Sequence, residues 1–287
     1  MNYKLLKENE PIIIKGHDNA DVDSLASCYL LQKLLAYKGI KSKVLISDGI
    51  IDPLYDIKNY PLETIDSISQ ENKLFLVDHY YKAENVIACI DHHPSDIVNN
   101  ENFLYKPQSA CAKMIYDEMI KENVPIDKHI VYLTVYSLYM DTLSFKSKKA
   151  IKEDIIWAKE QFEKYNFDEK KLYDAGLMLN DISIIDKKTV TYGFKNYIIN
   201  NNTVGTSYLI LKYKPEAKKM NAIIEEIEKY NTYDYWIHFI NCVDEDKTYV
   251  YLIIGNKYIE KVFDGMLSRG KNLIPILHDK LPQKLKK

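Results

Sequence analysis

Short apolar runs and longer amphipathic segments alternate along the first hundred residues. Mostly apolar runs typical of buried strands cover residues 11–15, 43–46, 73–77 and 86–90. After the first run, apolar residues recur at helical spacing as far as Gly39, which ends the predicted helix. Asp23 and Ser24 stand at the start of this helix and predict its N-cap. Strands that alternate with helices in this way are typical of an α/β fold built on a parallel sheet.

The pattern changes in the second half of the chain. Apolar residues at helical spacing cover 108–122, 127–141, 152–165 and 168–179. Past a connector near 180–188, we expect strands at 190–199, 203–213, 235–242 and 248–254, with a turn at residues 200–202. The pattern also predicts a helix after Pro215 and a short helix after residue 254. We therefore expect two domains, one over residues 1–182 and a smaller α+β domain over residues 188–287.

Composition and charge exclude several classes of protein. The chain has 287 residues, 46% of them hydrophobic, which is enough for a full core. A formal net charge of -2 gives no electrostatic reason to expect a nucleic-acid or membrane partner. The apolar stretches at 12–14 and 129–140 are too short for a secretion signal or a membrane span. We expect a soluble cytoplasmic protein whose four widely separated cysteines are buried free thiols.

Histidine and aspartate occur together in three short segments before residue 100. These are GHDNADVDS, VDH and IDHH, and a fourth segment, MDTLSFKS, adds one more aspartate. Three of the four begin where a predicted strand ends, and the carboxyl ends of parallel strands share one edge of a sheet. We therefore expect their side chains to converge. The candidate metal ligands are His17, Asp21, Asp23, Asp78, His92 and Asp141.

Two imidazoles and four carboxylates are more ligands than one structural zinc requires. They suit two divalent metals that share a bridging carboxylate, and they favour Mn, Co, Fe or Zn over a pure magnesium site. Such a centre lowers the pKa of a bridging water, and the hydroxide so formed can attack phosphorus in line. Taken singly, Asp23 could equally be a helix cap, and His17 or His92 a half-buried histidine. His79 could orient a neighbouring ligand without binding metal itself.

These segments resemble the four motifs of the DHH phosphoesterase superfamily. GHDNADVDS and DTLSFKS are most similar to the manganese-dependent (family II) inorganic pyrophosphatases and their exopolyphosphatase relatives. The C-terminal part is similar to a DHHA2 domain, with Ser268-Arg269-Gly270-Lys271 in place of the family's SRK element. The resemblance covers nearly the whole chain. It implies a DHH metal-binding catalytic domain over residues 1–182, a DHHA2 substrate-binding domain over residues 188–287, and an active site between them.

The resemblance also implies a role for each candidate ligand. His17 and Asp21 would hold one metal, and Asp78 would bridge it to a second. The second metal would be held by Asp23, His92 and Asp141. The catalytic His93 would face the substrate and hydrogen-bond its bridging or leaving oxygen. The implied cofactors are two Mn²⁺ ions, with Co²⁺ as an alternative and an additional Mg²⁺ allowed with the substrate.

Further residues are implied to bind the substrate's phosphate groups. Lys195 matches the family's phosphate-binding lysine, and Arg269 matches the arginine that grips the electrophilic or leaving phosphate. Ser268 and Lys271 flank that arginine and would contribute to the same site. Arg269 is the only arginine in the chain, and its planar fork of donors suits bidentate phosphate binding better than a lysine does.

The chain departs from the family pattern around the substrate rather than at the metal ligands. Tyr80 and Tyr81 replace an asparagine and an acid, and Pro94 stands where the family has a basic residue. The segment at residues 108–112 lacks the family's glycine, and Gly270 removes one cation. The residues that would hold metal are therefore matched more closely than those that would bind substrate.

Metal-dependent hydrolysis of a phosphoanhydride bond is the expected activity, with inorganic pyrophosphate as the first candidate substrate and orthophosphate as the product. An exopolyphosphatase or another small phosphoanhydride or phosphoester hydrolase is the alternative. A third hypothesis is a regulator that binds phosphate without catalysing a reaction. A nuclease is less favoured, because a glycine-rich GGGH segment is absent. The resemblance also suggests a homodimer.

Overall fold

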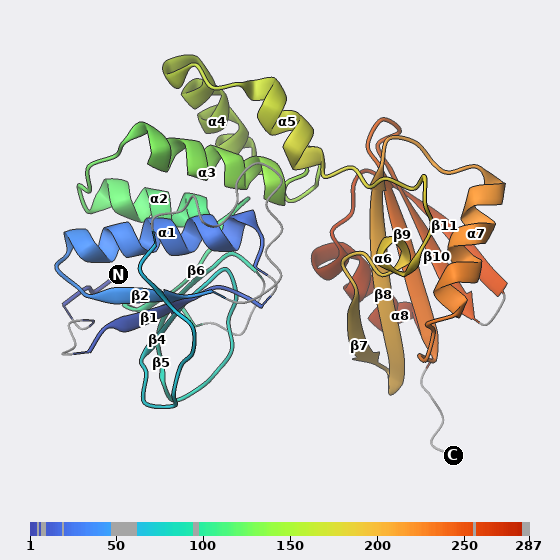
Figure 1. The fold of residues 1–287 in the computed structure, drawn as a ribbon, viewed down its shortest axis with the longest axis horizontal. Helices are drawn as coiled ribbons and strands as arrows, with labels where there is room; N and C mark the ends of the chain where they lie inside the picture. Colours follow the sequence, from blue (N-terminus) through green and yellow to red (C-terminus); the bar gives the residue numbers. More distant parts are fainter. Residues whose placement is uncertain are drawn as a thin grey trace. The chain divides into compact units, whose positions relative to one another are not determined.

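The computed structural model describes residues 1–4, 6, 10–18, 20–46, 62–93, 98–254 and 257–282, without the side chain of Lys271. The chain divides into two compact units (Figure 1). The first comprises Met1–Phe145 and Lys149–Gly176, and the second Lys146–Lys148 and Leu177–Lys287. Segment 177–187, which we assigned partly to the first domain and partly to a connector, groups with the second unit. Asn180 fixes it there, because its backbone and side chain exchange hydrogen bonds with Ile210.

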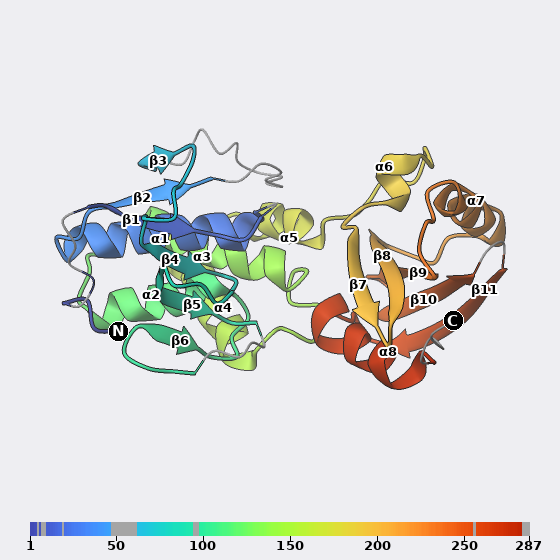
Figure 2. The ribbon, with the colours of Figure 1, turned by 90° about the horizontal axis from the view of Figure 1, so that it is seen from below.

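The first unit is built on a parallel sheet, as expected. Six strands of the described residues form it in the order β3-β2-β1-β4-β5-β6, with β3 and β6 at opposite edges (Figure 2). The strands are β1 (Ile12–Lys15), β2 (Ser42–Leu45), β3 (Thr64–Ile65), β4 (Leu74–Val77), β5 (Val86–Asp91) and β6 (Phe103–Tyr105). The chain runs outward from β1 to β3 and then returns to the other side of β1. The strand order therefore reverses between β1 and β4, where ligands bind in open parallel sheets.

Helices α1, α2 and α3 lie together over one face of this sheet (Figure 1). The helices of the first part of the chain are α1 (Val22–Tyr37), α2 (Cys111–Lys121), α3 (Lys128–Asp141), α4 (Lys152–Tyr165) and α5 (Glu169–Leu177). The first ten residues of α1 are all buried, polar ones included. A helix that is buried around its whole circumference, as α1 is over these residues, lies in the interior of its domain. This central position of α1 brings its N-terminus next to the carboxyl end of β1.

The predicted N-cap of α1 is wrong, and the correction matters for the site. Asp21 is the cap, since its side chain accepts a hydrogen bond from the N–H of Ser24 at 3.0 Å. Asp23 lies inside the first turn, and its carboxylate instead accepts the N–H groups of Cys111 and Ala112 at 2.7 and 2.9 Å. Asp23 thus caps α2, whose own N-cap position is an alanine without a side-chain acceptor.

The second unit is a five-stranded sheet, in the order β11-β10-β9-β8-β7, with short helices. Its elements are α6 (Lys187–Val190), β7 (Lys195–Ile199), β8 (Asn202–Leu211), α7 (Ala217–Glu228), β9 (Tyr235–Cys242), β10 (Lys247–Ile254), β11 (Lys257–Asp264), a π-helical turn η2 (Arg269–Leu273) and α8 (Ile274–Lys280). Among the strand pairs described in this sheet, β8 and β9 are parallel and the others are antiparallel. Asn200 and Asn201 both have left-handed φ angles, which confirms the predicted turn between β7 and β8.

Two predictions for this unit are wrong. The short helix expected after residue 254 is a strand, because β11 pairs along its whole length with β10. The strand expected from residue 190 begins only at Lys195, since Lys187–Val190 are helical. The described cysteines are free and buried, as expected. Among the described helices, none combines the length and apolarity needed to cross a bilayer.

A buried histidine in the second unit predicts how its stability depends on pH. Burial lowers the pKa of His238 to about 3, and its Nδ1 lies 2.8 Å from Ser207 Oγ. The unfolded chain takes up this proton near pH 6.5, so stability falls as the pH drops below that value. We expect a loss of about 2 kcal/mol between roughly pH 6.5 and 4.5 that His238→Gln does not show.

Urea unfolding followed by Trp236 fluorescence measures this effect. Trp236 is buried beside the pair and donates its indole N–H to Ser207 Oγ at 2.9 Å. The only other tryptophan, Trp157, is replaced by phenylalanine in both proteins. Equal pH slopes for the two proteins would contradict the prediction.

Candidate metal centre

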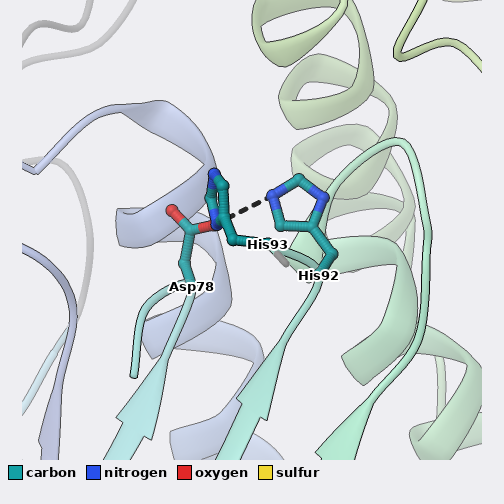
Figure 3. A group of neighbouring side chains, drawn as sticks. All are labelled: Asp78, His92 and His93. Carbon is teal, nitrogen blue, oxygen red and sulfur yellow. Dashed lines mark ion pairs between the residues drawn. The ribbon is translucent and has the colours of Figure 1, made fainter. Parts of the chain in front are cut away.

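The carboxyl ends of three neighbouring strands carry most of the candidate ligands. His17 follows β1 after one residue, Asp78 follows β4 directly, and His92 follows β5 directly. Figure 3 shows Asp78, His92 and His93 meeting beyond the ends of β4 and β5. Asp141 is the last residue of α3. The sheet edge inferred from the sequence therefore brings these side chains together.

Two local features of the backbone make this convergence possible. A Cβ on Gly16 would stand 2.1 Å from Ser24 Oγ, so only glycine lets β1 approach α1 this closely. The same hydroxyl accepts the N–H of His17 at 3.2 Å. Asp78 has a left-handed φ of +63°, unusual for a residue other than glycine. Such a conformation persists where its surroundings fix it, and the Asp78 N–H is bound to Ile90 O at 3.0 Å.

The carboxylate of Asp78 lies between two imidazoles. Its Oδ2 is 3.4 Å from His17 Nε2, and its Oδ1 is 3.2 Å from His92 Nε2. Further carboxylates complete each side. Asp21 lies 3.5 Å from His17 Nε2, whereas Asp23 and Asp141 lie 3.6 and 3.5 Å from His92 Nε2.

These distances define compact groups of possible metal ligands. One is His17, Asp21 and Asp78; another is Asp23, His92 and Asp141; a third is Asp78, His92 and His93. Within each group the ligand atoms lie within 4.8 Å of one another. Asp78 belongs to the first and third groups, and His92 to the second and third. The groups therefore form one continuous cluster.

Each of the two central histidines is held by its other ring nitrogen. His17 Nδ1 lies 2.9 Å from the carbonyl oxygen of Asp18, and His92 Nδ1 lies 2.9 Å from that of Gln108. A carbonyl can only accept, so both Nδ1 atoms carry hydrogen and donate. The atom left to bind a metal is therefore Nε2, which faces the carboxylates. This is the arrangement found behind histidines that ligate metals.

The segment in which the chain lacks the family's glycine preserves this support. The side chain of Gln108 donates to Asp154 Oδ1 at 2.6 Å, and the Ser109 N–H donates to Asp154 Oδ2 at 3.1 Å. Both contacts are buried. They fix the backbone that presents the Gln108 carbonyl to His92. Glutamine is thus accommodated in the interior without displacing the histidine's partner.

Asp23 combines a structural contact with its place in the cluster. Besides the two N–H groups of α2, its Oδ1 accepts the hydroxyl of Ser137 at 2.5 Å. Ser137 lies one helical turn before Asp141, so both face the cluster from α3. Sequence reasoning missed Ser137, although the spacing of four residues was a signal.

The pKa shifts of the clustered residues show that the carboxylates stabilise positive charge among them. Burial lowers the pKa of His17, but the carboxylates of Asp21 and Asp78 outweigh it and raise that pKa to about 11. The pKa of His92 rises in the same way to about 9, chiefly through Asp78. Burial and the charge of Asp78 raise the pKa of Asp23 well above its usual range. The proton that each imidazole holds is a positive charge that a divalent cation could replace.

The donor atoms fit a divalent cation. Within the described residues, Asp78 Oδ1, His92 Nε2 and Asp141 Oδ2 are buried and have no hydrogen-bond partner. A buried polar atom without a partner destabilises the folded state. A cation bound between these atoms would give each of them a partner. The mixture of imidazole nitrogen and carboxylate oxygen suits borderline-hard metals such as Mn²⁺. The residues present can therefore hold metal.

His93 lies at the edge of the cluster and is positioned by Asp91, to which the sequence analysis assigned no role. Its Nδ1 is 3.0 Å from Asp91 Oδ1 and 3.7 Å from Asp78 Oδ1. Asp91 also accepts the His93 backbone N–H at 3.0 Å. The histidine side chain remains 42% exposed, so one face of the ring is accessible. His79 Nδ1 lies 2.9 Å from the carbonyl oxygen of Val77.

The candidate phosphate-binding residues lie in the second unit. Arg269, the first residue of η2, donates to the carbonyl oxygen of Gly193, and its guanidinium lies over the Tyr208 ring. It also reaches Thr206 Oγ1 at 3.4 Å, and that hydroxyl donates to the carbonyl oxygen of Lys195 at 2.9 Å. Thr206 thus links Arg269 to the backbone of Lys195.

Ser268 and Lys271 are the other two predicted phosphate-binding residues. Ser268 precedes η2, and its N–H donates to Asn272 Oδ1 at 2.9 Å. The side chain of Lys271, like the whole of Pro94, lies outside the described part of the structure.

Comparison with known proteins agrees with this geometry. Residues 11–137 match the family model described as DHH family, N-terminal domain. The chain is 26% identical over 319 residues to the manganese-dependent inorganic pyrophosphatase of Bacillus subtilis (strain 168), covering 96% of this chain and 100% of that protein. It is 24% identical over 311 residues to the protein of the same name from Methanocaldococcus jannaschii, covering 92% and 97%.

A solved structure shares the fold. It is a Methanococcus jannaschii protein assigned to the family II inorganic pyrophosphatases, with a TM-score of 0.67 and 20% sequence identity. The match covers 93% of this chain and 98% of that one. The two-unit α/β architecture is therefore that of a known fold.

Proposed function

From the premise that residues 11–137 are a DHH family N-terminal domain, we propose that this protein is a metal-dependent phosphohydrolase. Its substrate is inorganic pyrophosphate, and its product is orthophosphate. The observation that carries this proposal is the position of Asp78, with one carboxylate oxygen toward His17 and the other toward His92. The similarity to manganese-dependent inorganic pyrophosphatases over nearly the whole chain supports the same activity.

The cluster of side chains supports the ligand set proposed from the sequence. One Mn²⁺ is assigned to His17 and Asp21, and a second to the group Asp23, His92 and Asp141. Asp78 would contribute one carboxylate oxygen to each. Divalent metals supply Lewis-acid chemistry: they neutralise phosphate charge and lower the pKa of water. Co²⁺ has similar ligand preferences and is expected to substitute, and an additional Mg²⁺ with the substrate is part of the proposal.

The chain's own residues bind and orient the substrate. The exposed face of His93 is proposed to hydrogen-bond the bridging or leaving oxygen, while Asp91 holds the ring in place. Lys195 and Arg269 are proposed to bind phosphate, together with Ser268 and Lys271. Arginine is suited to this role, because its fork of N–H donors matches two oxygens of one phosphate group. The second unit is proposed to be a DHHA2 domain on the same grounds.

A panel of metals and substrates tests the proposed function. The purified protein is stripped with a chelator and reloaded with Mn²⁺, Co²⁺, Zn²⁺ or Mg²⁺. Orthophosphate release is then measured from pyrophosphate, tripolyphosphate and long-chain polyphosphate. We expect the stripped protein to be inactive and Mn²⁺ or Co²⁺ to restore activity, with pyrophosphate the fastest substrate.

Each other outcome identifies a different function. Faster release from longer chains would identify an exopolyphosphatase instead. Tight binding of pyrophosphate without turnover in any of the metals would identify a non-catalytic phosphate-binding regulator. Either result would overturn the proposed activity.

A further inference from the structure

A lysine ammonium points into the carboxylate cluster. Lys149 forms an ion pair with Asp141 Oδ1, and its side chain is only 12% exposed. The lysine follows Asp141 by eight residues, on the connection between α3 and α4, where the chain re-enters the first unit. Two residues later, the Ile151 N–H donates to Ser109 Oγ at 2.8 Å. The backbone near the lysine is therefore tied to the support of His92.

The charge of Lys149 is coupled to both sides of the cluster. Burial lowers its pKa, but the carboxylates of Asp141, Asp78 and Asp21 outweigh this and raise the pKa above its usual value. Asp21 and Asp141 belong to different ligand groups, which are joined by Asp78. The ammonium thus lies in the field of the whole cluster. The Lys149 ammonium is one of the positive charges that balance the carboxylates of the cluster.

Counting charges indicates what this ammonium does when metals are present. The four carboxylates Asp21, Asp23, Asp78 and Asp141 carry four negative charges, which two divalent cations cancel. The two imidazoles are then neutral, because they must lose their protons to bind metal. The ammonium of Lys149 then adds a positive charge that these four carboxylates no longer cancel. A polyanionic substrate requires such a surplus, and a lysine on a flexible stem can turn from a carboxylate to a phosphate oxygen.

We propose that Lys149 is a substrate-binding residue of this centre. Its ammonium pairs with Asp141 while no metal is bound, and it pairs with a phosphate oxygen of the substrate once metals occupy the carboxylates. The proposal rests on the proposed function and extends it. It gives the site a cation within the first unit, in addition to those proposed in the second.

Two effects of opposite sign follow from this dual role. Without metal, the ammonium competes with a cation for Asp141, so removing it strengthens the binding of Mn²⁺. With metal bound, the ammonium contributes a charge-assisted hydrogen bond to phosphate, so removing it weakens the binding of substrate. A residue that only supports the fold would weaken both.

The test compares Lys149→Met and Lys149→Gln with the matched variant Lys152→Met. Lys152 is an exposed lysine at the start of α4. Mn²⁺ affinity of the metal-free proteins is measured by electron paramagnetic resonance of the free ion. Affinity of the Mn²⁺-loaded proteins for imidodiphosphate, a non-hydrolysable analogue of pyrophosphate, is measured by titration calorimetry. Neither readout requires turnover.

We expect both Lys149 variants to bind Mn²⁺ several-fold more tightly and imidodiphosphate about tenfold more weakly than the unaltered protein. Lys149→Arg should retain most of the analogue affinity, and Lys152→Met should change neither affinity. Unchanged analogue affinity in the Met and Gln variants, or weaker binding of both ligands, would overturn the proposal. Failure of the unaltered protein to bind Mn²⁺ at all would instead reject the proposed function itself.

Discussion

Replacing Asp78 by alanine is expected to abolish phosphate release and the binding of metal together. The carboxylate faces both histidines, at 3.4 and 3.2 Å, so its loss removes a ligand from each side of the cluster. Removing a residue that merely supports a metal ligand typically lowers metal affinity or activity by about 10–100-fold. Loss of a ligand shared by two metals should exceed this. We expect residual activity at the level of the metal-free protein.

Thermal unfolding with and without Mn²⁺ distinguishes this effect from misfolding. A ligand that binds only the folded state stabilises it by about 2.7 kcal/mol when its concentration is 100 times Kd. The unaltered protein should therefore melt at a higher temperature with Mn²⁺, whereas Asp78→Ala should not respond. Asp174→Ala is the control, because Asp174 is an exposed residue of α5 that pairs only with Lys170 among the described residues. A Mn²⁺-dependent shift in Asp78→Ala equal to that of the control would refute the bridging role.

Replacing Asp23 by alanine should destabilise the protein even without metal. The change leaves the N–H groups of Cys111 and Ala112 and the hydroxyl of Ser137 without their acceptor in a buried place. Each such loss costs about 1–3 kcal/mol, and relief of repulsion from Asp78 offsets part of the sum. We expect the free energy of unfolding to fall by about 2–4 kcal/mol.

Urea unfolding in the presence of a chelator measures this change. Asp23→Asn is the matched control, because it removes the same negative charge but keeps a side-chain oxygen that can accept a hydrogen bond from α2. It should lose less stability than Asp23→Ala under these conditions. If the two metal-free variants unfolded at the same urea concentration, the capping of α2 would contribute nothing to stability.

The position of the site could be predicted because it depends on a property of the fold rather than on distances. A polar residue at the carboxyl end of a buried parallel strand must lie at one edge of the sheet. β1, β4 and β5 all follow this rule, and β5 could be recognised from VIACI alone. Short strands without a marked apolar run, such as β3 and β6, could not be recognised in this way.

Contacts between distant segments were beyond sequence reasoning. The acceptor for the Cys111 N–H comes from Asp23, 88 residues earlier, and no spacing rule connects them. The contact of Lys149 with Asp141 depends on the path of an irregular connection, which local patterns do not specify. The strand β11 was mistaken for a helix because pairing with β10 decides its conformation, and that pairing is tertiary. These failures share one cause, which is the dependence of a residue's partner on the whole fold.

The capping of α2 by Asp23 bears on how descendants of this chain would evolve. A lineage that no longer needed catalysis could lose His17 or Asp141 with less harm to folding than Asp23, whose capping of α2 would still be retained by selection for stability. The presence of Asp23 in a related sequence is therefore weak evidence that the related protein is a hydrolase. Substitutions should be sought first at His17, which caps no helix.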